Sequence, residues 1–391
     1  MKTKKSMKHC RGSGTVIDPL PINDYIGPDS KDIATLVDKG LVCYNGGRLR
    51  EICWLLRDIL SRDDVVLGLS ISGALTPAGF GVSIFAPLIE AGWIDYMVST
   101  GANIYHDIHY ALDFKFNVKY PWGKDDELRE KGIVRIYDIL FDNKVLFDTD
   151  KYCLDLMKKP EFRKKMGTSE LHYRLAKYVD ETAKKNSARP CMLTAARKYD
   201  VPIYAPAPCD GTLGLNAGAL EMSGLPVQWD SVHDINEITG LAYWARQEGR
   251  KSAVLVLGGG VPKNYILQTG PQIQEILHLE DDGHDYFMQL TDARQDTGGL
   301  SGATPSEAVT WGKVNPETIS RNIVCHADVT IALPIIAAYL FATVKPRKPK
   351  RLYQKREECY DALKKAFLGK KNRIIMENHD YKNLEPRIST N

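Results

Sequence analysis

The sequence predicts an α/β fold built on a single doubly wound, mostly parallel sheet. Two observations lead to this fold class. Short apolar runs rich in β-branched residues recur along the chain, and segments with helical spacing of apolar residues separate them. Because the runs are continuously apolar, each strand is expected to be covered by helices on both faces.

The predicted strands and helices alternate in chain order. Runs such as VVLGLSIS, AVLVLGG and YFMQLT combine aliphatic, β-branched and aromatic residues, which favours strands, and the intervening segments carry the helical period. The predicted strands are 65–72, 94–100, 201–206, 253–259, 286–291 and 329–336. The predicted helices are 80–90, 104–112, 170–184, 190–198, 235–249 and 337–342.

One domain is expected to carry the sheet. Residues 1–35 mix basic, Pro, Gly and Asp residues without a period and are expected to form an N-terminal arm. The α/β domain is placed at 36–345, and the charge-rich segment 113–165 is interpreted as an insertion into it. Residues 346–391 form a basic C-terminal extension, whose charge run indicates a solvated helix rather than a binding segment.

The bulk composition narrows the function classes. Over 391 residues the formal charge is +3 and the sequence pI is about 8.3, so no large positive field favours nucleic-acid binding. The eight cysteines show no C-x-x-C pair, which is typical of reduced thiols in a cytoplasmic protein. No apolar run reaches the roughly 20 residues that span a bilayer, so a membrane protein is not expected.

The turns after the predicted strands carry the candidate ligand site. In an open parallel sheet, ligands bind beyond the carboxyl ends of the strands. Here these turns are SGALTPAGFG, STGANIYHD, PAPCDGTLG, GGGVPKN and TDARQDTGGLSGATPSEAVTWGK. Glycine lets a ligand approach the backbone, and free N–H groups at helix starts bind phosphate, so a dinucleotide or similarly large phosphorylated cofactor is expected.

Some signals in these turns are open to two interpretations. The G-x-G-x-x-G fingerprint is absent, and Gly258-Gly259-Gly260 alone also fits a plain tight turn. Asp328, in CHAD, could accept ribose hydroxyls or could cap the start of a helix.

Two other groups are weighed as functional candidates. His106 and His109 lie at i and i+3 of a predicted helix without a third ligand nearby, so hydrogen-bonding or core histidines are predicted and no metal site. Cys209 precedes Asp210 but lacks a paired base, so it is predicted to be a buried structural cysteine.

Lys313, in the string SEAVTWGK, is the candidate nucleophile. It directly follows Trp311 and Gly312, and an aromatic ring beside an amine lowers the amine pKa by desolvation. A neutral lysine can form an imine with a carbonyl or displace another amine from an iminium. Glu307 could hold a substrate ammonium, whereas the alternative is that Lys313 is a surface residue of a loop.

Five separated motifs resemble the deoxyhypusine synthase and homospermidine synthase family. They are STGAN, CDGTLG, LGGGVPKN, SEAVTWGK and HADVTIALPII, within residues 65–343. The resemblance implies a Rossmann-like NAD-binding fold, assembled as a homotetramer with active sites between paired subunits. It also implies NAD-dependent oxidation of a polyamine such as spermidine and capture of its aminobutyl group as an imine on a lysine. The group then passes to a lysine of a translation factor precursor or, in the homospermidine branch, to putrescine, and the product imine is reduced.

The resemblance implies roles residue by residue. Lys313 matches the imine-forming lysine, Trp311 the tryptophan that packs along the polyamine, and Glu307 the acid that binds its nitrogen. The positions matched to the cofactor are Ala74, Leu75, Thr76, Thr100, Gly101, Ala102, Asp210, Gly259, Asp292, Ala293, Asp328 and Val329. The other positions matched to the substrate site are His106, Leu215, Asn264, Gly298, Gly299 and Leu300.

Several of these positions depart from the family pattern. Leu215 and Leu300 stand where the family has aspartates, Asn264 replaces a histidine, His106 a glutamate and Gln289 a tyrosine. Two lost carboxylates remove acceptors for a distal ammonium, because an unpaired buried charge is unfavourable. The resemblance therefore implies a deoxyhypusine synthase-like transferase whose donor, acceptor or both differ. The alternatives are a true deoxyhypusine synthase, a homospermidine synthase, and a non-catalytic paralogue, against which the retained lysine argues.

Overall fold

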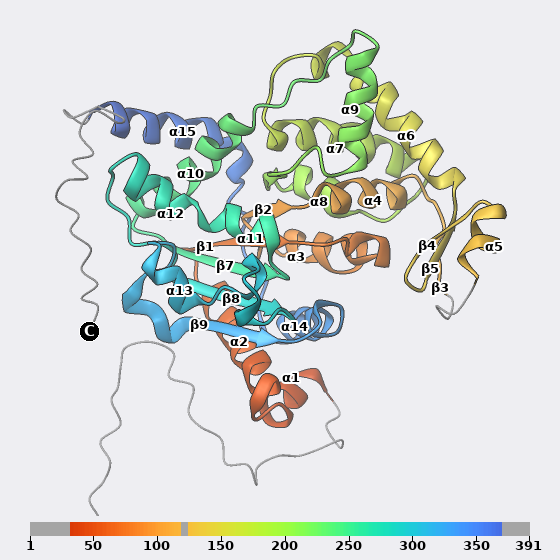
Figure 1. Ribbon diagram of the computed structural model, residues 1–391. Coiled ribbons are helices and arrows are strands. Elements are labelled where there is room, and N and C mark those ends of the chain that lie inside the picture. Colours follow the sequence, from red (N-terminus) through yellow and green to blue (C-terminus); the bar gives the residue numbers. More distant parts are fainter. Residues whose placement is uncertain (1–31, 119–123, 370–391) are drawn as a thin grey trace, which may run out of the picture.

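The computed structural model describes residues 32–118 and 124–369 and contains a six-stranded parallel sheet (Figure 1). The strands lie in the order β6-β2-β1-β7-β8-β9. Their bounds are β1 (Val65–Ile71), β2 (Tyr96–Ser99), β6 (Ile203–Tyr204), β7 (Lys251–Leu257), β8 (Tyr286–Thr291) and β9 (Asn322–His326). The predicted α/β fold with one doubly wound sheet is confirmed.

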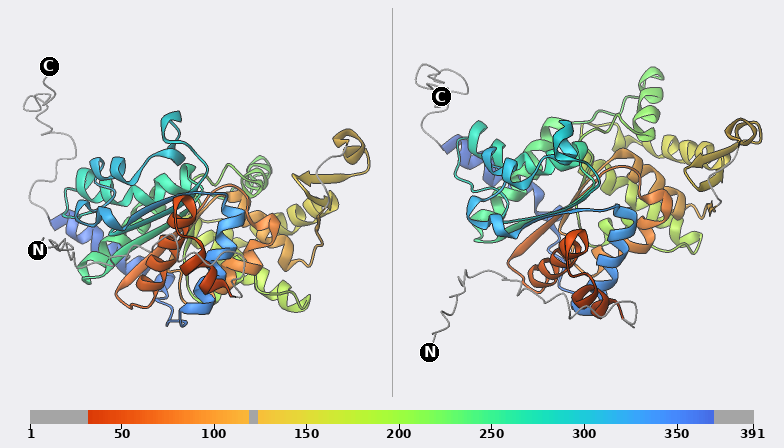
Figure 2. Two further views of the ribbon diagram at one scale, coloured as in Figure 1. Left: turned by 90° about the horizontal axis from the view of Figure 1, so that it is seen from below. Right: turned by 60° about the horizontal axis from the view of Figure 1, so that its bottom comes forward.

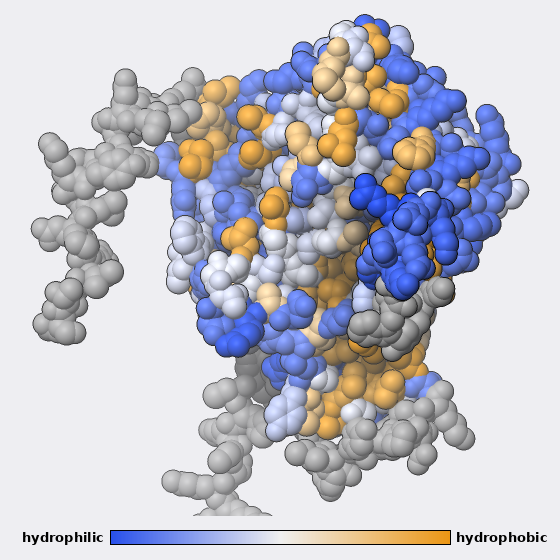
Figure 3. All heavy atoms as spheres, turned by 45° about the vertical axis from the view of Figure 1, so that its right-hand side comes forward, coloured by the Kyte–Doolittle hydropathy of each residue, from blue (hydrophilic) through white to orange (hydrophobic). Residues whose placement is uncertain are grey.

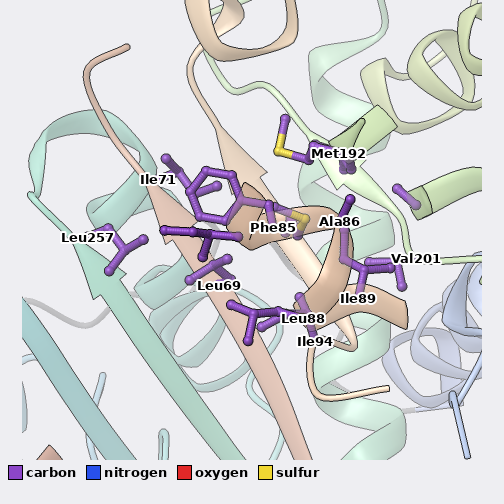
Figure 4. Close-up of a cluster of buried hydrophobic side chains, with 14 of the residues drawn as sticks. Leu69, Ile71, Phe85, Ala86, Leu88, Ile89, Ile94, Met192, Val201 and Leu257 are labelled. Carbon is purple, nitrogen blue, oxygen red and sulfur yellow. The ribbon is translucent and has the colours of Figure 1, made fainter. Parts of the chain in front are cut away.

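Helices cover both faces of the sheet (Figures 1 and 2). The first core contains side chains of α2 (Tyr44–Leu60), α3 (Ala86–Glu90), α4 (Gly101–Ala111), α6 (Lys144–Met157), α7 (Thr168–Lys185), α8 (Met192–Lys198), α9 (Thr212–Met222) and α14 (Val329–Thr343). The second core contains side chains of α10 (Ser231–Gln247), α11 (Gly260–Leu267), α13 (Pro305–Thr310) and α15 (Leu352–Gly369). Neighbouring residues of β1 face opposite cores: Leu69 and Ile71 pack in the first, near Phe85 (Figure 4), and Val66 packs in the second.

Short turns of 3₁₀- or π-helix and two short α-helices are also present. They are α1 (Ile33–Thr35), α12 (Thr269–Pro271), η3 (Leu36–Gly40), η4 (Thr76–Ala78), η5 (Gly81–Phe85), η6 (Pro160–Phe162), η7 (Gln272–Ile276), η8 (Gln295–Thr297), η9 (Leu300–Gly302) and η10 (Pro316–Arg321). Across the described ranges, no helix is long and apolar enough to cross a membrane.

The first five predicted strands are present as β1, β2, β6, β7 and β8, but the sixth prediction was wrong. Residues 329–336 belong to α14, and the sixth strand is β9, just before it. The run VTIALPII is apolar all round, so its period does not distinguish a buried helix from a buried strand. The helix begins with an N-terminal cap, in which the Asp328 side chain accepts a hydrogen bond from the Thr330 backbone N–H at 2.6 Å.

Part of the segment 113–165 forms a small sheet beside the main one, whereas α6 and Phe162 of the same segment pack in the first core. Its three short strands, β3 (Asn117–Val118), β4 (Ile133–Ile136) and β5 (Ile139–Asp142), pair antiparallel in the order β3-β5-β4. Helix α5 (Asp125–Glu130) has no buried residue, and hydrophilic side chains cover this part of the surface (Figure 3).

Both ends of the chain extend past the described residues. Of the predicted N-terminal arm, residues 1–31 lie outside the description, as do residues 370–391 of the basic extension. Helix α15 is only partly solvated, because Leu352, Tyr353, Cys359 and Leu363 are buried in it, and the Tyr353 ring stacks on Tyr173 with centroids 3.6 Å apart. The predicted division of the chain at 35 and at 345 stays a prediction.

Candidate active site

The predicted cofactor residues all follow strands at one edge of the sheet. Because the six strands are parallel, their carboxyl ends meet at this edge. In the spatial order of the strands, the residues are Asp210 after β6, Thr100, Gly101 and Ala102 after β2, Ala74, Leu75 and Thr76 after β1, Gly259 after β7, Asp292 and Ala293 after β8, and Asp328 and Val329 after β9. The chain runs outward from β1 on one side and from β7 on the other, so the switch point of the topology lies between these two strands.

The backbone at the switch point is open to a ligand. Gly73 has a φ of +67° and Gly260 one of +59°, and no atom lies within 4 Å of where a Cβ would stand at either position. Ser72 joins the two turns, since its Oγ donates to the Leu257 carbonyl at 2.9 Å and accepts from the Gly259 N–H at 2.8 Å. These two glycines leave room for the phosphates of a dinucleotide, whereas Gly101 at the start of α4 is buried against the backbone of Asp210 and Gly211.

Asn103 positions the turn after β1, although this residue is not among those predicted from the sequence. Its Oδ1 accepts from the backbone N–H of Leu75 at 2.7 Å and of Thr76 at 3.2 Å, and its Nδ2 donates to the Gly73 carbonyl at 3.2 Å. Thr76 is fully buried and its hydroxyl donates to the Asn103 carbonyl. Asn103 is the last residue of the motif STGAN and lies one turn into the helix that Thr100 caps, so the sequence did contain a signal for it.

Lys313 lines a cavity of about 290 Å³ on the second face of the sheet. Four residues of the predicted substrate site line it as well: Asn264, Leu300, Glu307 and Trp311. Lys313 Nζ donates to Asn264 Oδ1 at 2.9 Å and lies 5.5 Å from the centre of the Trp311 ring. Burial lowers the pKa of Lys313, against an opposing effect of the Glu307 carboxylate, which is the direction that the sequence predicted.

The turn that carries Lys313 is held by close backbone contacts. Thr304 caps the start of helix α13, since its hydroxyl accepts from the Glu307 N–H at 3.1 Å, and Trp311 caps the end of the helix. Gly312 then has a φ of +64°, and a Cβ there would stand 2.4 Å from Gln274 Oε1. Gln274 Nε2 donates to the Gly312 carbonyl at 2.8 Å, so glycine is the residue that this turn admits.

A second lysine, Lys263, is buried beside the first. It is 3% exposed, and its ammonium donates to Gln289 Oε1 at 3.0 Å, the Ser301 carbonyl at 3.2 Å and the Ala303 carbonyl at 2.7 Å. Burial, aided by the charge of Lys313, lowers the pKa of Lys263 to about 8. The sequence reading missed this residue, although a lysine inside the apolar string VPKNYIL is the kind of signal that marks it.

The other predicted substrate residues lie outside the cavity. Gly298 and Gly299 belong to the loop that leads to Leu300, and Leu215 stands on α9 with 71% of its side chain exposed. His106 lies on α4, where its Nδ1 is 3.1 Å from Nε2 of His109.

The two histidines are hydrogen-bonded to each other, as predicted, and His109 is buried whereas His106 is partly buried. His109 Nδ1 lies 2.8 Å from Thr149 Oγ1, and burial lowers the pKa of His106 to about 4 and that of His109 to about 3. Among the described residues, no three His, Cys, Asp or Glu side chains are grouped to hold a metal ion. Asp328 caps α14, the second of its two interpretations, and Cys209 is exposed, so its predicted burial was wrong because it lies in a surface turn.

Known proteins resemble this chain over most of its length. The family model described as deoxyhypusine synthase matches residues 37–340. A "Deoxyhypusine synthase-like protein" of Nostoc punctiforme is 50% identical over 360 residues, which cover 92% of this chain and 91% of the relative. A "Probable deoxyhypusine synthase 2" of Methanosarcina acetivorans is 33% identical over 314 residues, or 79% of this chain and 86% of the relative.

The fold is also found in a solved structure. A crystal structure described as a candidate deoxyhypusine synthase from Entamoeba histolytica aligns with a TM-score of 0.50 at 14% identity, over 81% of this chain and 94% of that one. At this identity the match speaks for the fold alone.

Proposed function

Because the chain belongs to the deoxyhypusine synthase family, we propose that it is an NAD-dependent aminoalkyl transferase that carries the transferred group as an imine on Lys313. The single observation that carries this proposal is the placement of Lys313 in a cavity with Glu307, with an amine whose pKa burial lowers. A nucleophilic lysine needs this neutral form.

The residues at the carboxyl edge of the sheet would hold NAD. The open backbone of Gly73 and Gly260 would receive its phosphates, and exposed carboxylates such as Asp210 and Asp292 would accept its ribose hydroxyls. Held there, NAD would supply the oxidant for the carbon next to the donor nitrogen and the reductant for the product imine.

Lys313 performs the transfer between two amines. Its neutral Nζ adds to the iminium carbon of the oxidised donor and forms a C–N bond. A proton passes from Nζ to the donor nitrogen, the original C–N bond breaks and the smaller amine leaves. The acceptor amine then adds to the same carbon and, after the reverse proton transfer, releases Lys313.

Neighbouring side chains orient this chemistry. Asn264 accepts a hydrogen bond from Lys313 and so directs the amine, while Glu307 offers the carboxylate for a substrate ammonium. Trp311, 55% exposed at the rim, offers a ring face for the alkyl chain.

The test is to follow amine-dependent reduction of NAD and product formation in the wild type and in Lys313→Ala. Lys364→Ala, an exposed lysine on α15, is the matched control. We expect Lys313→Ala to abolish product formation while NAD still binds, and the control to behave as the wild type. Full turnover by Lys313→Ala would overturn the proposal.

The acceptor is either a small amine or a protein lysine. Transfer of label from spermidine to a translation factor precursor would indicate a true deoxyhypusine synthase, and free homospermidine formed from putrescine would indicate a homospermidine synthase. NAD binding without turnover of any amine would indicate a non-catalytic paralogue.

We also propose a cytoplasmic homotetramer of the family type. Exposed Leu215 and Met222 on α9 offer an apolar surface for contact between subunits. Light scattering of the purified protein tests the tetramer directly.

A further inference from the structure

A buried histidine from another part of the chain fixes the backbone of Lys313. His284 stands two residues before β8, and its backbone N–H donates to the Lys313 carbonyl at 3.0 Å. Its own carbonyl accepts from the Asn315 N–H at 3.0 Å, so the two hydrogen bonds bracket the fully buried Val314. A Cβ at Gly283 would stand 2.7 Å from the Lys313 carbonyl carbon, so the two segments are in direct backbone contact.

The ring of the same histidine binds helix α11. Its Nε2 lies 3.2 Å from the carbonyl oxygen of Ile266, and its Nδ1 lies 2.7 Å from Ser252 Oγ on β7. His284 is 2% exposed, and burial lowers the pKa of its ring well below the ordinary value, so the ring is neutral at pH 7. Because a carbonyl oxygen can only accept, Nε2 carries the hydrogen, and Nδ1 accepts from the Ser252 hydroxyl.

Helix α11 also carries the hydrogen-bond acceptor of the Lys313 amine. Asn264 stands two residues before Ile266, and its Oδ1 accepts from Lys313 Nζ at 2.9 Å. The contacts therefore close a ring: the Lys313 amine binds Asn264, the helix leads on to Ile266, and His284 returns to the Lys313 main chain. A shift of α11 away from the His284 ring would change the distance between the Lys313 amine and its acceptor.

Resting on the function proposed above, we propose that His284 is a positioning residue: by holding α11 against the segment that carries Lys313, its ring keeps the Lys313 amine within hydrogen-bond reach of Asn264. A lysine side chain has several rotatable bonds, so an amine held in one place reacts faster than one that samples many positions. Lys263 anchors the same helix to the segment 301–303, so α11 should shift rather than detach when the His284 anchor is removed.

Two variants of His284 separate the two hydrogen bonds of its ring. The side-chain amide of His284→Gln reaches about as far as Nε2 and can still donate to the Ile266 carbonyl, whereas the shorter amide of His284→Asn reaches only as far as Nδ1 and Ser252. Ser252→Ala is the matched control, because it removes the hydrogen bond at Nδ1 of the same buried ring and leaves the link to Ile266 intact.

Butyraldehyde with cyanoborohydride measures the reactivity of the Lys313 amine without NAD or an amine donor. Nζ adds to the aldehyde carbon, water leaves, and cyanoborohydride reduces the C=N bond to a stable secondary amine. Peptide mass spectrometry gives the labelling rate of Lys313 relative to that of Lys364, an exposed lysine on α15 of the same molecule. Urea denaturation of each variant separates a displaced amine from a general loss of stability.

We expect His284→Asn to slow the relative labelling of Lys313 at least fivefold and His284→Gln to stay within twofold of the wild type. Ser252→Ala should lose stability but label at the wild-type rate. Labelling of His284→Asn at the wild-type rate, or equal slowing in His284→Asn, His284→Gln and Ser252→Ala, would overturn this inference. The expected labelling pattern in a protein that turns over no amine with NAD would instead count against the proposed function and leave the positioning by His284 intact.

Discussion

Replacing Gly312 by alanine tests whether the turn before Lys313 is built as the structure indicates. Two separate effects are expected. The φ of +64° is a left-handed conformation that disfavours any side chain, and the new Cβ would stand 2.4 Å from Gln274 Oε1. Gln274 would have to move, and its 2.8 Å hydrogen bond to the Gly312 carbonyl would be lost.

The magnitude follows from these two terms. A left-handed backbone costs about 1–2 kcal/mol for a residue with a Cβ, and a hydrogen bond of this kind contributes about 1 kcal/mol. Gly312→Ala should therefore lower the free energy of unfolding by about 2–3 kcal/mol. Because Lys313 is the next residue, the reaction at its amine should slow by about tenfold or more, since small displacements of a reacting group are costly.

Gly249→Ala is the matched control. Gly249 has a φ of +65° in the turn after α10, but no atom lies within 4 Å of its missing Cβ. It should lose only the backbone term, about 1–2 kcal/mol, and should react at the wild-type rate. Urea denaturation measures the free energies, and the rate of borohydride-trapped adduct formation measures the reaction. If both variants lost equal stability and both labelled Lys313 at the wild-type rate, the reasoning about Gln274 would be refuted.

Three further changes test other parts of the account. Burial lowers the pKa of Lys263 from 10.5 to about 8, so between these pH values the unfolded chain binds more protons than the folded one, and the free energy of unfolding should rise with pH. Urea denaturation at a series of pH values should show this rise in the wild type and not in Lys263→Met. An identical rise in the variant would contradict the assignment. Asn103→Ala removes the acceptor for the N–H groups of Leu75 and Thr76, so the free energy of unfolding should fall by about 2–3 kcal/mol. Titration with NAD should show weaker binding. Unchanged NAD affinity would argue against a role for this turn in NAD binding. Thr304→Ala removes the cap of α13 and should lower the free energy of unfolding in urea by about 1 kcal/mol; no change would mean that the cap contributes nothing.

The sheet could be predicted from the sequence because its strands are buried on both faces. The runs at β1, β7 and β8 are mostly apolar and buried along their whole covered length, with buried polar exceptions such as Ser70, Ser252 and Gln289. The run at 329–336 failed because α14 is apolar around most of its circumference, so a two-residue period and a helical period were equally compatible with it. The Asp328 cap, a contact between near neighbours, marks where the helix begins.

The candidate site was partly predictable for a related reason. Residues directly after parallel strands must meet at one edge, so Thr100, Gly259 and Asp292 could be grouped without coordinates. Lys263 and Asn103 stand in motifs that marked them, but their roles could not be predicted, because these depend on hydrogen bonds to distant segments such as 301–303 and 73–76. Only folding brings these segments together.

The most direct measurement of the central claim is peptide mass spectrometry of the protein after incubation with an amine donor and borohydride, with and without NAD. The account predicts an alkyl adduct on Lys313 that forms only when NAD is present. An adduct that forms on another lysine instead, or no adduct across a broad amine panel although NAD binds, would contradict it.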